Sequence, residues 1–379
     1  MYDMTLSQEE QLMLQSVREY SENVIAPAAK EADATGEFPW DVVKKGIELG
    51  LHALPIPEAY GGAGISSVLM SILAEEMSKA CAGIATTLGA TGLSCYPVLI
   101  AGNEEQKKLY FDTIMAGALG AFCLTEPGAG SDSGSVAATA ERDGGDYVLN
   151  GSKTFITNGG VAGIYTVFAT VDRSRGLKGL SAFMVERGRA GLSVGKEENK
   201  MGIRASNTTD VVFTNVRVPA SHLLGREGDG FKIAMTTLDR SRHSVGAQAV
   251  GICQAALEAS IRYANERKQF GKPIGANQAI QFMLADMATQ TEAARWLVRR
   301  AAWLQDQGLP YSMESAMAKT FAGDTAMQVT TDAVQIFGGY GYSRDYPIEK
   351  LMRDAKIMQI FEGTNQIQRV VIAGRLLKA

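Results

Sequence analysis

The chain has 379 residues, of which 46% are hydrophobic and 21% are charged, and its formal net charge at pH 7 is -4. This length and composition are typical of a folded protein of two or three domains, and the slight negative charge disfavours binding to nucleic acid or to an anionic membrane surface. No signal peptide pattern opens the chain and no uninterrupted apolar run reaches about 18 residues, so we expect a cytoplasmic protein without a membrane span.

The first part of the chain, residues 1–120, is predicted to be helical. Ser7 and Glu10 have the spacing of a capping box, and the apolar residues after them recur on one face of a helix. Further segments of helical pattern cover residues 40–51, 68–79 and 104–115, and turns rich in glycine and proline join them.

Short β-type segments replace the helices from about residue 121. The run 147–157 carries Asn150-Gly151 between two apolar halves, which is the pattern of a hairpin with a tight turn. Further strands are predicted at residues 165–171, 180–185 and 210–218. We therefore expect a compact, mostly antiparallel β domain over residues 121–230.

From residue 231 the predicted helices return and are longer. Segments of helical pattern at 241–268, 278–307, 313–337 and 348–379 are joined by short connections, which is typical of an antiparallel four-helix bundle. Alanine and methionine on more than one face indicate packing between subunits. The predicted fold is thus α+β and multidomain: an N-terminal helical domain, a central antiparallel β domain and a C-terminal four-helix bundle.

Three stretches rich in glycine are candidates for binding a phosphate group. The first, 61–64, reads as a turn. The second, 125–132, follows an apolar strand and lacks the spacing and the βαβ context of a dinucleotide fold, although its small residues allow close approach of a ligand. The third, 338–342, follows a helix, where a C-cap is the alternative reading. The three histidines and four cysteines are scattered, which disfavours a metal site or a Ser-His-Asp triad and favours reduced, buried thiols.

A single carboxylate, Glu362, interrupts the helical sequence near the C-terminus. On its own this pattern fits a solvated or capping carboxylate as well as a catalytic one. Taken in order, however, six blocks resemble the signature motifs of the acyl-CoA dehydrogenases, nearest to the short-chain, butyryl-CoA-type branch. They are FCLTEPGAGSD at 122–132, KTFITNG at 153–159, LDRSR at 238–242, RKQFGKPI at 267–274, QIFGGYG at 335–341 and IFEGT at 360–364.

This resemblance implies an FAD-dependent enzyme, a homotetramer with one FAD per chain, that desaturates an acyl-CoA thioester between its α- and β-carbons. It also implies that electrons pass to an electron-transferring flavoprotein. Contacts from Arg267, Phe270 and Gln278 are implied to cross a subunit interface. The implied FAD contacts are Phe122, Leu124, Thr125, Gly130, Ser131, Phe155, Ile156, Thr157, Arg267, Phe270, Gln278, Gln335, Gly338, Gly339, Thr364 and Gln366. The implied acyl-CoA contacts are Ser131, Asp239, Arg242 and Gly363.

By the same resemblance Glu362 is the base that removes the α-proton, and burial is expected to raise its pKa. The backbone N–H of the base and a ribityl hydroxyl of the FAD are the implied donors to the thioester oxygen. Some branches carry the base on the earlier helix, at a position that Ser241 occupies here. Phe361 and Phe155 replace a more usual Tyr and Trp of the family, and both keep an aromatic ring.

Several alternatives stay open at this point. Within the family, the chain could act on branched, aromatic or dicarboxylic acyl-CoAs, or run as an enoyl-CoA reductase, and an acyl-CoA oxidase is disfavoured by the short chain. In another class, it could be a flavin-binding protein without catalysis. Glu362 and Arg242 argue against that reading, and the acidic balance argues against a nucleic-acid-binding relative. The acyl-chain length is expected at four to six carbons.

Overall fold

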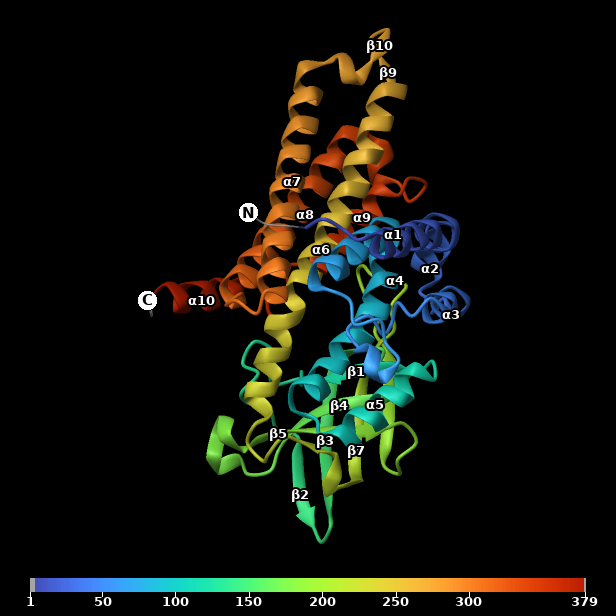
Figure 1. Cartoon of the computed structure of the whole chain (residues 1–379). Helices are drawn as coiled ribbons and strands as arrows, with labels where there is room; N and C mark the ends of the chain where they lie inside the picture. Colours follow the sequence, from blue (N-terminus) through green and yellow to red (C-terminus); the bar gives the residue numbers. More distant parts are fainter. Residues whose placement is uncertain (1–3, 378–379) are drawn as a thin grey trace.

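The computed structural model describes residues 4–377, with a β-sheet at one end and long helices running toward the other (Figure 1). Helices come first along the chain, the sheet follows, and helices return. The first three helices lie beside the middle of the long helices. This arrangement confirms the predicted α+β architecture.

The amino-terminal helices agree with the sequence pattern except in one length. The capping box is present, because Ser7 and Glu10 each accept the other's backbone N–H. One predicted segment, 68–79, is instead a helix of 35 residues that is buried on several faces. A helix apolar all round lacks the amphipathic period that marks a helix in a sequence. The helices are α1 (Gln8–Tyr20), α2 (Ala26–Thr35), α3 (Trp40–Glu48), α4 (Ser67–Ala101) and α5 (Glu104–Met115).

Within residues 4–377, α4 is the one helix long and apolar enough in composition to cross a bilayer. Its serine, threonine and glycine residues break up the uninterrupted apolar run for which the sequence was searched. Of its most apolar 18-residue window, 67% is buried inside the protein, where α4 packs against α6 (Gly230–Glu266) and the sheet. Burial of this extent is what a core helix shows.

The central unit is an eight-stranded sheet, mostly antiparallel, in the order β6-β7-β3-β2-β4-β5-β8, with β1 paired in parallel with β4. The strands are β1 (Leu119–Cys123), β2 (Thr139–Asp143), β3 (Asp146–Thr157), β4 (Ala162–Thr170), β5 (Leu180–Glu186), β6 (Leu192–Glu197), β7 (Thr208–Pro219) and β8 (Leu223–Leu224).

The predicted hairpin at Asn150-Gly151 is wrong. Residues 146–157 form one strand, β3, which pairs with β7 along both of its halves. Asn150-Gly151 makes a β-bulge at a register shift, where Gly151 has φ of 145° and the Asn150 side chain accepts the backbone N–H of Asn215. The turn instead lies at Gly144-Gly145 between β2 and β3, where Gly144 has φ of 62°, and β3 pairs with β7 on both sides of the bulge.

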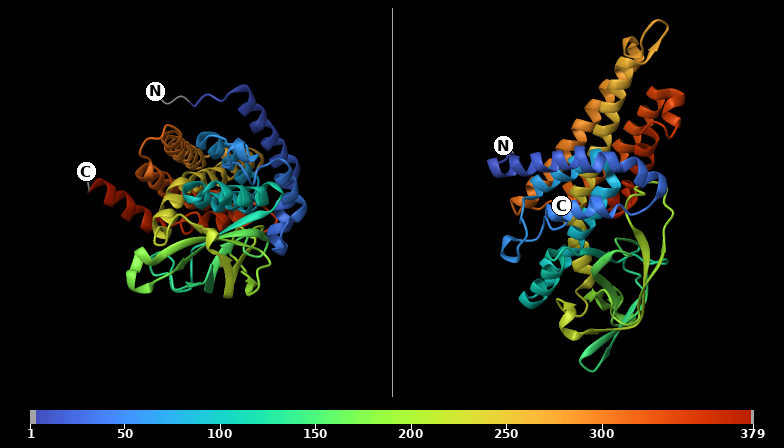
Figure 2. Two further views of the ribbon diagram at one scale, coloured as in Figure 1. Left: turned by 60° about the horizontal axis from the view of Figure 1, so that its bottom comes forward. Right: turned by 90° about the vertical axis from the view of Figure 1, so that its right-hand side faces the viewer.

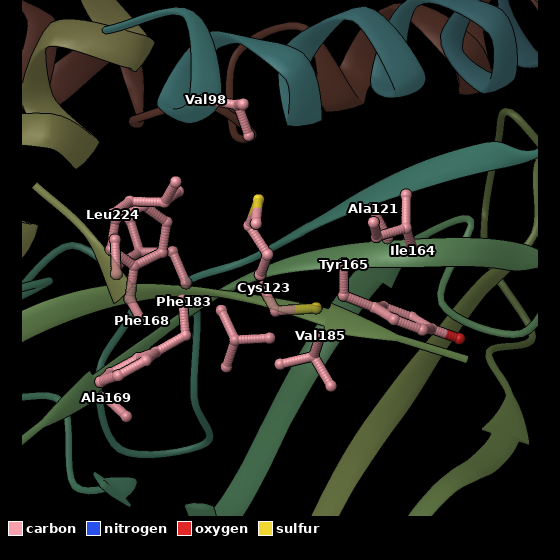
Figure 3. Close-up of a cluster of buried hydrophobic side chains, with 14 of the residues drawn as sticks. Val98, Ala121, Cys123, Ile164, Tyr165, Phe168, Ala169, Phe183, Val185 and Leu224 are labelled. Carbon is pink, nitrogen blue, oxygen red and sulfur yellow. The ribbon is translucent and has the colours of Figure 1, made fainter. Parts of the chain in front are cut away.

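The core around the sheet has one part between the strands and α4 and a second part on the opposite side of β4 and β5 (Figure 3). Val98 reaches down from α4 and the ring of Phe168 on β4 rises toward it, whereas Phe183 on β5 pairs with Val167 and lies on the other side of these strands; all three are fully buried. Cys123 on β1 pairs with Val167 and lies on the same side as Phe183, and it is free and buried like Cys81, Cys95 and Cys253. This core fixes β1 and β3, whose ends carry several of the predicted site residues.

The carboxyl-terminal helices form the bundle, with the fourth predicted segment divided in two (Figure 2). A small hairpin, β9 (Lys268–Gln269) and β10 (Lys272–Pro273), joins α6 to α7 at the far end from the sheet (Figure 1). The last helix points away from the body and carries exposed apolar residues such as Val370 and Leu376. The helices after α6 are α7 (Gln278–Asp306), α8 (Ser312–Phe337), α9 (Ile348–Ile357) and α10 (Asn365–Leu376).

Candidate active site

Glu362 lies in the linker that joins α9 to α10. Its φ is 53°, and that of the following Gly363 is 94°, so two successive residues adopt the left-handed region that disfavours every residue except glycine. Thr364 caps α10 by accepting the N–H of Ile367 at 3.2 Å. The carboxylate is therefore presented from a strained turn held between two helices.

Ser241 on α6 contacts this carboxylate directly. Its hydroxyl donates a hydrogen bond to Glu362, and the serine is buried. Ser241 occupies the position at which other branches of the family carry the base, and it is in direct contact with Glu362. Both residues address the same point in space from elements far apart in the chain.

The surroundings of Glu362 pull its pKa in opposite directions. Burial of the carboxyl group raises the pKa, whereas the Ser241 hydrogen bond and the cations of Arg242 and Lys319 lower it, and the net shift is upward. A carboxyl group with a raised pKa holds a proton more firmly once it has accepted one, which suits a general base. The predicted direction of the shift is confirmed.

Arg242 and Asp239 form an ion pair on the same face of α6. Arg242 is almost fully buried, and burial lowers its pKa while Asp239 and Glu362 oppose that effect. Its Nε is buried without a hydrogen-bond partner within residues 4–377. A buried guanidinium with an unused donor can take an acceptor atom from a ligand, which fits the predicted contact with an acyl-CoA.

The sequence analysis missed Lys319, which lies on α8 and is fully buried. Its ammonium donates to the Gly363 carbonyl at 2.8 Å and to the Asn365 side chain at 2.9 Å. A signal was present in the sequence, because Lys319 stands between Ala316 and Ala322 at helical spacing on an apolar face. A lysine on such a face is rarely buried without a function.

A second group of predicted residues lies at the ends of β1 and β3. The Thr154 N–H donates to the Thr125 carbonyl at 2.9 Å, which ties the two segments together. Phe155 has φ of 54° and is 65% exposed, so an aromatic ring stands out from the sheet at a bulge that the strand pattern did not predict. Thr157, two residues on, is half-buried.

Other members of this group offer backbone rather than side chain. Leu124 and Ile156 are buried in the core, and Phe122 packs its ring 5.0 Å from that of Phe168. Gly130 and Ser131 are exposed on the loop after β1, where a side chain added to Gly130 meets no atom within 4 Å. The loop therefore leaves room for a ligand beside its backbone.

A buried ion pair supports this segment from below. Lys153 and Glu126 are 2.6 Å apart, with side chains 0% and 5% exposed. Lys153 also donates to the Leu124 carbonyl at 3.1 Å, and Glu126 accepts the backbone N–H groups of Ala137 and Ala138. These bonds fix the backbone of the 124–126 segment.

The third group of predicted residues lies at the far end of α6. Arg267 follows the last residue of the helix and places its guanidinium 5.3 Å from the centre of the Tyr340 ring. With Gly338 and Gly339 it borders a cavity of about 540 Å³. Phe270, at the tip of the β9–β10 hairpin, is 98% exposed, and Gln278 and Gln335 are exposed nearby on α7 and α8.

The third group lies far from Glu362 and Arg242 within one chain. Arg242 and Arg267 are 25 residues apart on α6, or roughly 37 Å at the rise of an α-helix. Thr364 and the exposed Gln366 belong with Glu362. The donor sets themselves fit a dinucleotide: an exposed ring and threonine hydroxyls suit a flavin, and an arginine beside two open glycines suits a diphosphate.

Within residues 4–377, no group of three or more His, Cys, Asp or Glu side chains is placed to hold a metal ion.

Three family models match the chain: the acyl-CoA dehydrogenase N-terminal domain over residues 7–118, middle domain over 121–216 and C-terminal domain over 228–377. An acyl-CoA dehydrogenase of Bacillus subtilis is 50% identical, covering 99% of both chains. Acryloyl-CoA reductase (NADH) of Anaerotignum propionicum is 47% identical, covering 99% of this chain and 96% of that one.

Two solved structures are similar over nearly the whole chain. Butyryl-CoA dehydrogenase from Megasphaera elsdenii has a TM-score of 0.96 at 46% identity, with 99% and 100% of the two chains covered. A chain from a structure described as the electron transferring flavoprotein of Acidaminococcus fermentans has a TM-score of 0.97 at 48% identity, with both chains fully covered.

Proposed function

This chain belongs to the acyl-CoA dehydrogenase family, and on that premise we propose that it oxidises a short-chain acyl-CoA to the trans-2-enoyl-CoA. As a member of the family it is an oxidoreductase, and its cofactor is FAD. The carrying observation is the half-buried Glu362 carboxylate, hydrogen-bonded to Ser241 beside the buried Arg242. That arrangement supplies a base next to a cation able to hold the substrate.

Glu362 is proposed to take the proton from the α-carbon of the thioester. Its raised pKa suits it to hold that proton. The backbone N–H of Glu362 donates no hydrogen bond to any other residue of the described range 4–377, so it is available to the thioester oxygen as negative charge develops there. When bound, FAD supplies the acceptor for the hydride that leaves the β-carbon. Asp239, Arg242, Gly363 and Ser131 are the proposed contacts to the CoA portion.

We propose that each FAD is held by two copies of the chain. The flavin end belongs beside Phe155, Thr125 and Thr157, with Phe122, Leu124, Ile156, Gly130 and Ser131 completing that wall. The diphosphate and adenosine belong to Arg267, Phe270, Gln278, Gln335, Gly338 and Gly339 of a neighbouring copy, with Thr364 and Gln366 as remaining contacts. The roughly 37 Å between Arg242, which lies beside Glu362, and Arg267 supports this division.

The proposed assembly is a homotetramer. Phe282 and Trp296 on α7 and Val370 on α10 are all more than half exposed, and apolar faces of this kind mark contacts between chains. The proposed location is the cytoplasm, since Cys81, Cys95, Cys123 and Cys253 are free. The proposed electron acceptor is an electron-transferring flavoprotein, which the Acidaminococcus similarity supports.

The proposed acyl chain has four to six carbons. Gln248 lies seven residues after Ser241 on the same face of α6, roughly 10 Å along the helix. It is buried and accepts a hydrogen bond from Thr86 of α4 at 3.1 Å. This polar pair closes the space between α4 and α6, and a longer apolar chain entering there would strand it without solvent.

Anaerobic addition of butyryl-CoA to the purified holoenzyme tests this proposal. The yellow flavin absorbance should bleach within the mixing experiment, and rates across a panel of acyl-CoAs should favour four to six carbons. An enzyme that is colourless and takes up no FAD, or that prefers dodecanoyl-CoA, contradicts the proposal.

The reverse reaction is the second candidate, because the acryloyl-CoA reductase relative matches nearly the whole chain. In that direction the protonated Glu362 returns its proton to the α-carbon. Comparison of butyryl-CoA oxidation with crotonyl-CoA reduction, using the same electron-transferring flavoprotein, decides between the two directions.

A further inference from the structure

The turn that carries Glu362 is held by donors from outside the linker. The Gln368 side-chain amide donates to the carbonyls of Glu362 and Gly363 at 3.3 and 3.0 Å, and Lys319 donates to Gly363 at 2.8 Å. Both donors are fully buried. A glutamate keeps a left-handed backbone conformation only where its surroundings hold it there, and these hydrogen bonds provide that support.

Lys319 is an unusual choice of donor for this task. Its hydrogen-bond acceptors are a backbone carbonyl and the amide oxygen of Asn365, both neutral. Burial lowers its pKa to about 8, with Glu362 acting against that effect. A neutral donor or an apolar side chain avoids the cost of burying a charge, so fold stability alone does not account for a lysine here.

The charged and titratable groups around Glu362 come from three helices. Arg242 faces it from α6, Lys319 from α8 and Tyr96 from α4, and Asp324 acts on Lys319 from its own helix. Two cations therefore act on one half-buried carboxylate. Arg242 is already paired with Asp239, whereas Lys319 donates its hydrogen bonds, within residues 4–377, to a carbonyl and an amide oxygen and not to a carboxylate.

We propose that Lys319 is a positioning residue for Glu362. Its ammonium holds the Gly363 carbonyl, and with it the left-handed turn, while its positive charge faces the Glu362 carboxylate. This inference rests on the proposed role of Glu362 as the base. Lys319 does not contact the reacting atoms; it acts through the orientation and the proton affinity of Glu362.

The test compares K319M and K319Q with the wild-type holoenzyme. The first variant removes both the donor and the charge, and the second keeps a donor without the charge. Infrared difference spectra against E362Q follow the protonation of the Glu362 carboxyl with pH, without turnover. Rapid mixing with butyryl-CoA then gives the rate of flavin bleaching at each pH.

Removing the cation should raise the pKa of Glu362, so its titration moves to higher pH in both variants. Bleaching at high pH should slow by about 10- to 100-fold in K319M, since a small misplacement of a catalytic group has effects of that order, and by less in K319Q. A Glu362 titration that stays at the wild-type pH in both variants overturns the inference. So does loss of folded holoenzyme in both, because it makes Lys319 a structural residue.

Lys356 provides a matched control. It is an exposed lysine six residues before Glu362, bonded to Gln359, and K356M loses the same charge without moving the titration, since water screens it. E362Q separates this inference from the proposed function. If E362Q bleaches like the wild type, the base assignment fails; if it is slow while the Lys319 variants titrate normally, only this inference fails.

Discussion

The hydroxyl of Ser241 donates a hydrogen bond to the carboxylate of Glu362, although the two residues are 121 positions apart in the chain. Their side chains converge from α6 and from the α9–α10 linker. A carboxylate placed on either element could therefore reach the same neighbourhood. Exchanging the residues at positions 241 and 362 therefore tests whether a base on α6 can replace Glu362.

The double variant S241E/E362G should regain part of the bleaching that E362G loses. A glutamate at position 241 would project from α6 at the point where Ser241 now contacts Glu362, and it would lie beside the same Arg242. Stopped-flow reduction by butyryl-CoA compares the double variant with E362G and with the control S241A/E362G. Equal rates in all three contradict the view that the two positions share one site.

The buried ion pair beneath the 124–126 segment yields a stability prediction. K153M leaves the Glu126 carboxylate buried without its cation, which should lower the free energy of unfolding by about 3–5 kcal/mol. Urea denaturation of the holoenzyme at fixed FAD measures the loss. K108M, which breaks an exposed pair with Asp112, is the control and should change it by about 0.5 kcal/mol or less. Similar midpoints for the two variants contradict the prediction.

Phe270 tests the shared cofactor site. Its side chain is 98% exposed in one chain, so F270A should not weaken the fold of that chain. If a neighbouring copy and its FAD cover the ring, the variant should bind FAD about tenfold more weakly or worse. Flavin titration and light scattering measure this, with L12A, another exposed apolar residue, as control. If F270A forms a tetramer and binds FAD as tightly as the wild type, the shared site is contradicted.

His243 predicts how stability depends on pH. Burial, with Arg299 and Arg240 nearby, lowers its pKa from 6.5 to about 4. Between pH 6.5 and pH 4, His243 binds a proton in the unfolded chain but not in the folded chain. The free energy of unfolding therefore has its full value above pH 6.5 and falls as the pH drops toward 4. The loss approaches about 3 kcal/mol at pH 4. Thermal melting of wild type and H243L across this window should show a shallower slope in the variant; parallel slopes disagree with the prediction.

Much of the fold could be predicted from local pattern. The capping box at Ser7, helix α5 and the break before α10 follow from short-range rules that tertiary packing did not override. The hairpin predicted at Asn150-Gly151 is wrong because a bulge and a tight turn favour the same residues, and only the pairing with β7 decides between them. The length of α4 was missed because a helix buried on several faces has no amphipathic period.

The site divides in the same way. Glu362 and Arg242 belong to recognisable motifs, and the structure brings them together. Lys319, Gln368 and the contact of Ser241 depend on which turn of α8 or α6 faces the linker, which no local pattern specifies. The separation of Arg267 from Arg242 becomes plain only once α6 is seen as one unbroken helix. The predicted domain boundaries at 120 and 230 stay a prediction.

Rapid anaerobic mixing of E362Q with butyryl-CoA tests the central claim most directly. The amide is nearly isosteric and leaves the backbone N–H in place, yet it cannot accept the α-proton. FAD content and the Kd for a non-reacting acyl-CoA analogue should therefore stay close to the wild-type values, while flavin bleaching slows by about 10²–10⁴-fold. Bleaching of E362Q within a few-fold of the wild-type rate, with the same FAD content, contradicts the assignment of Glu362 as the base.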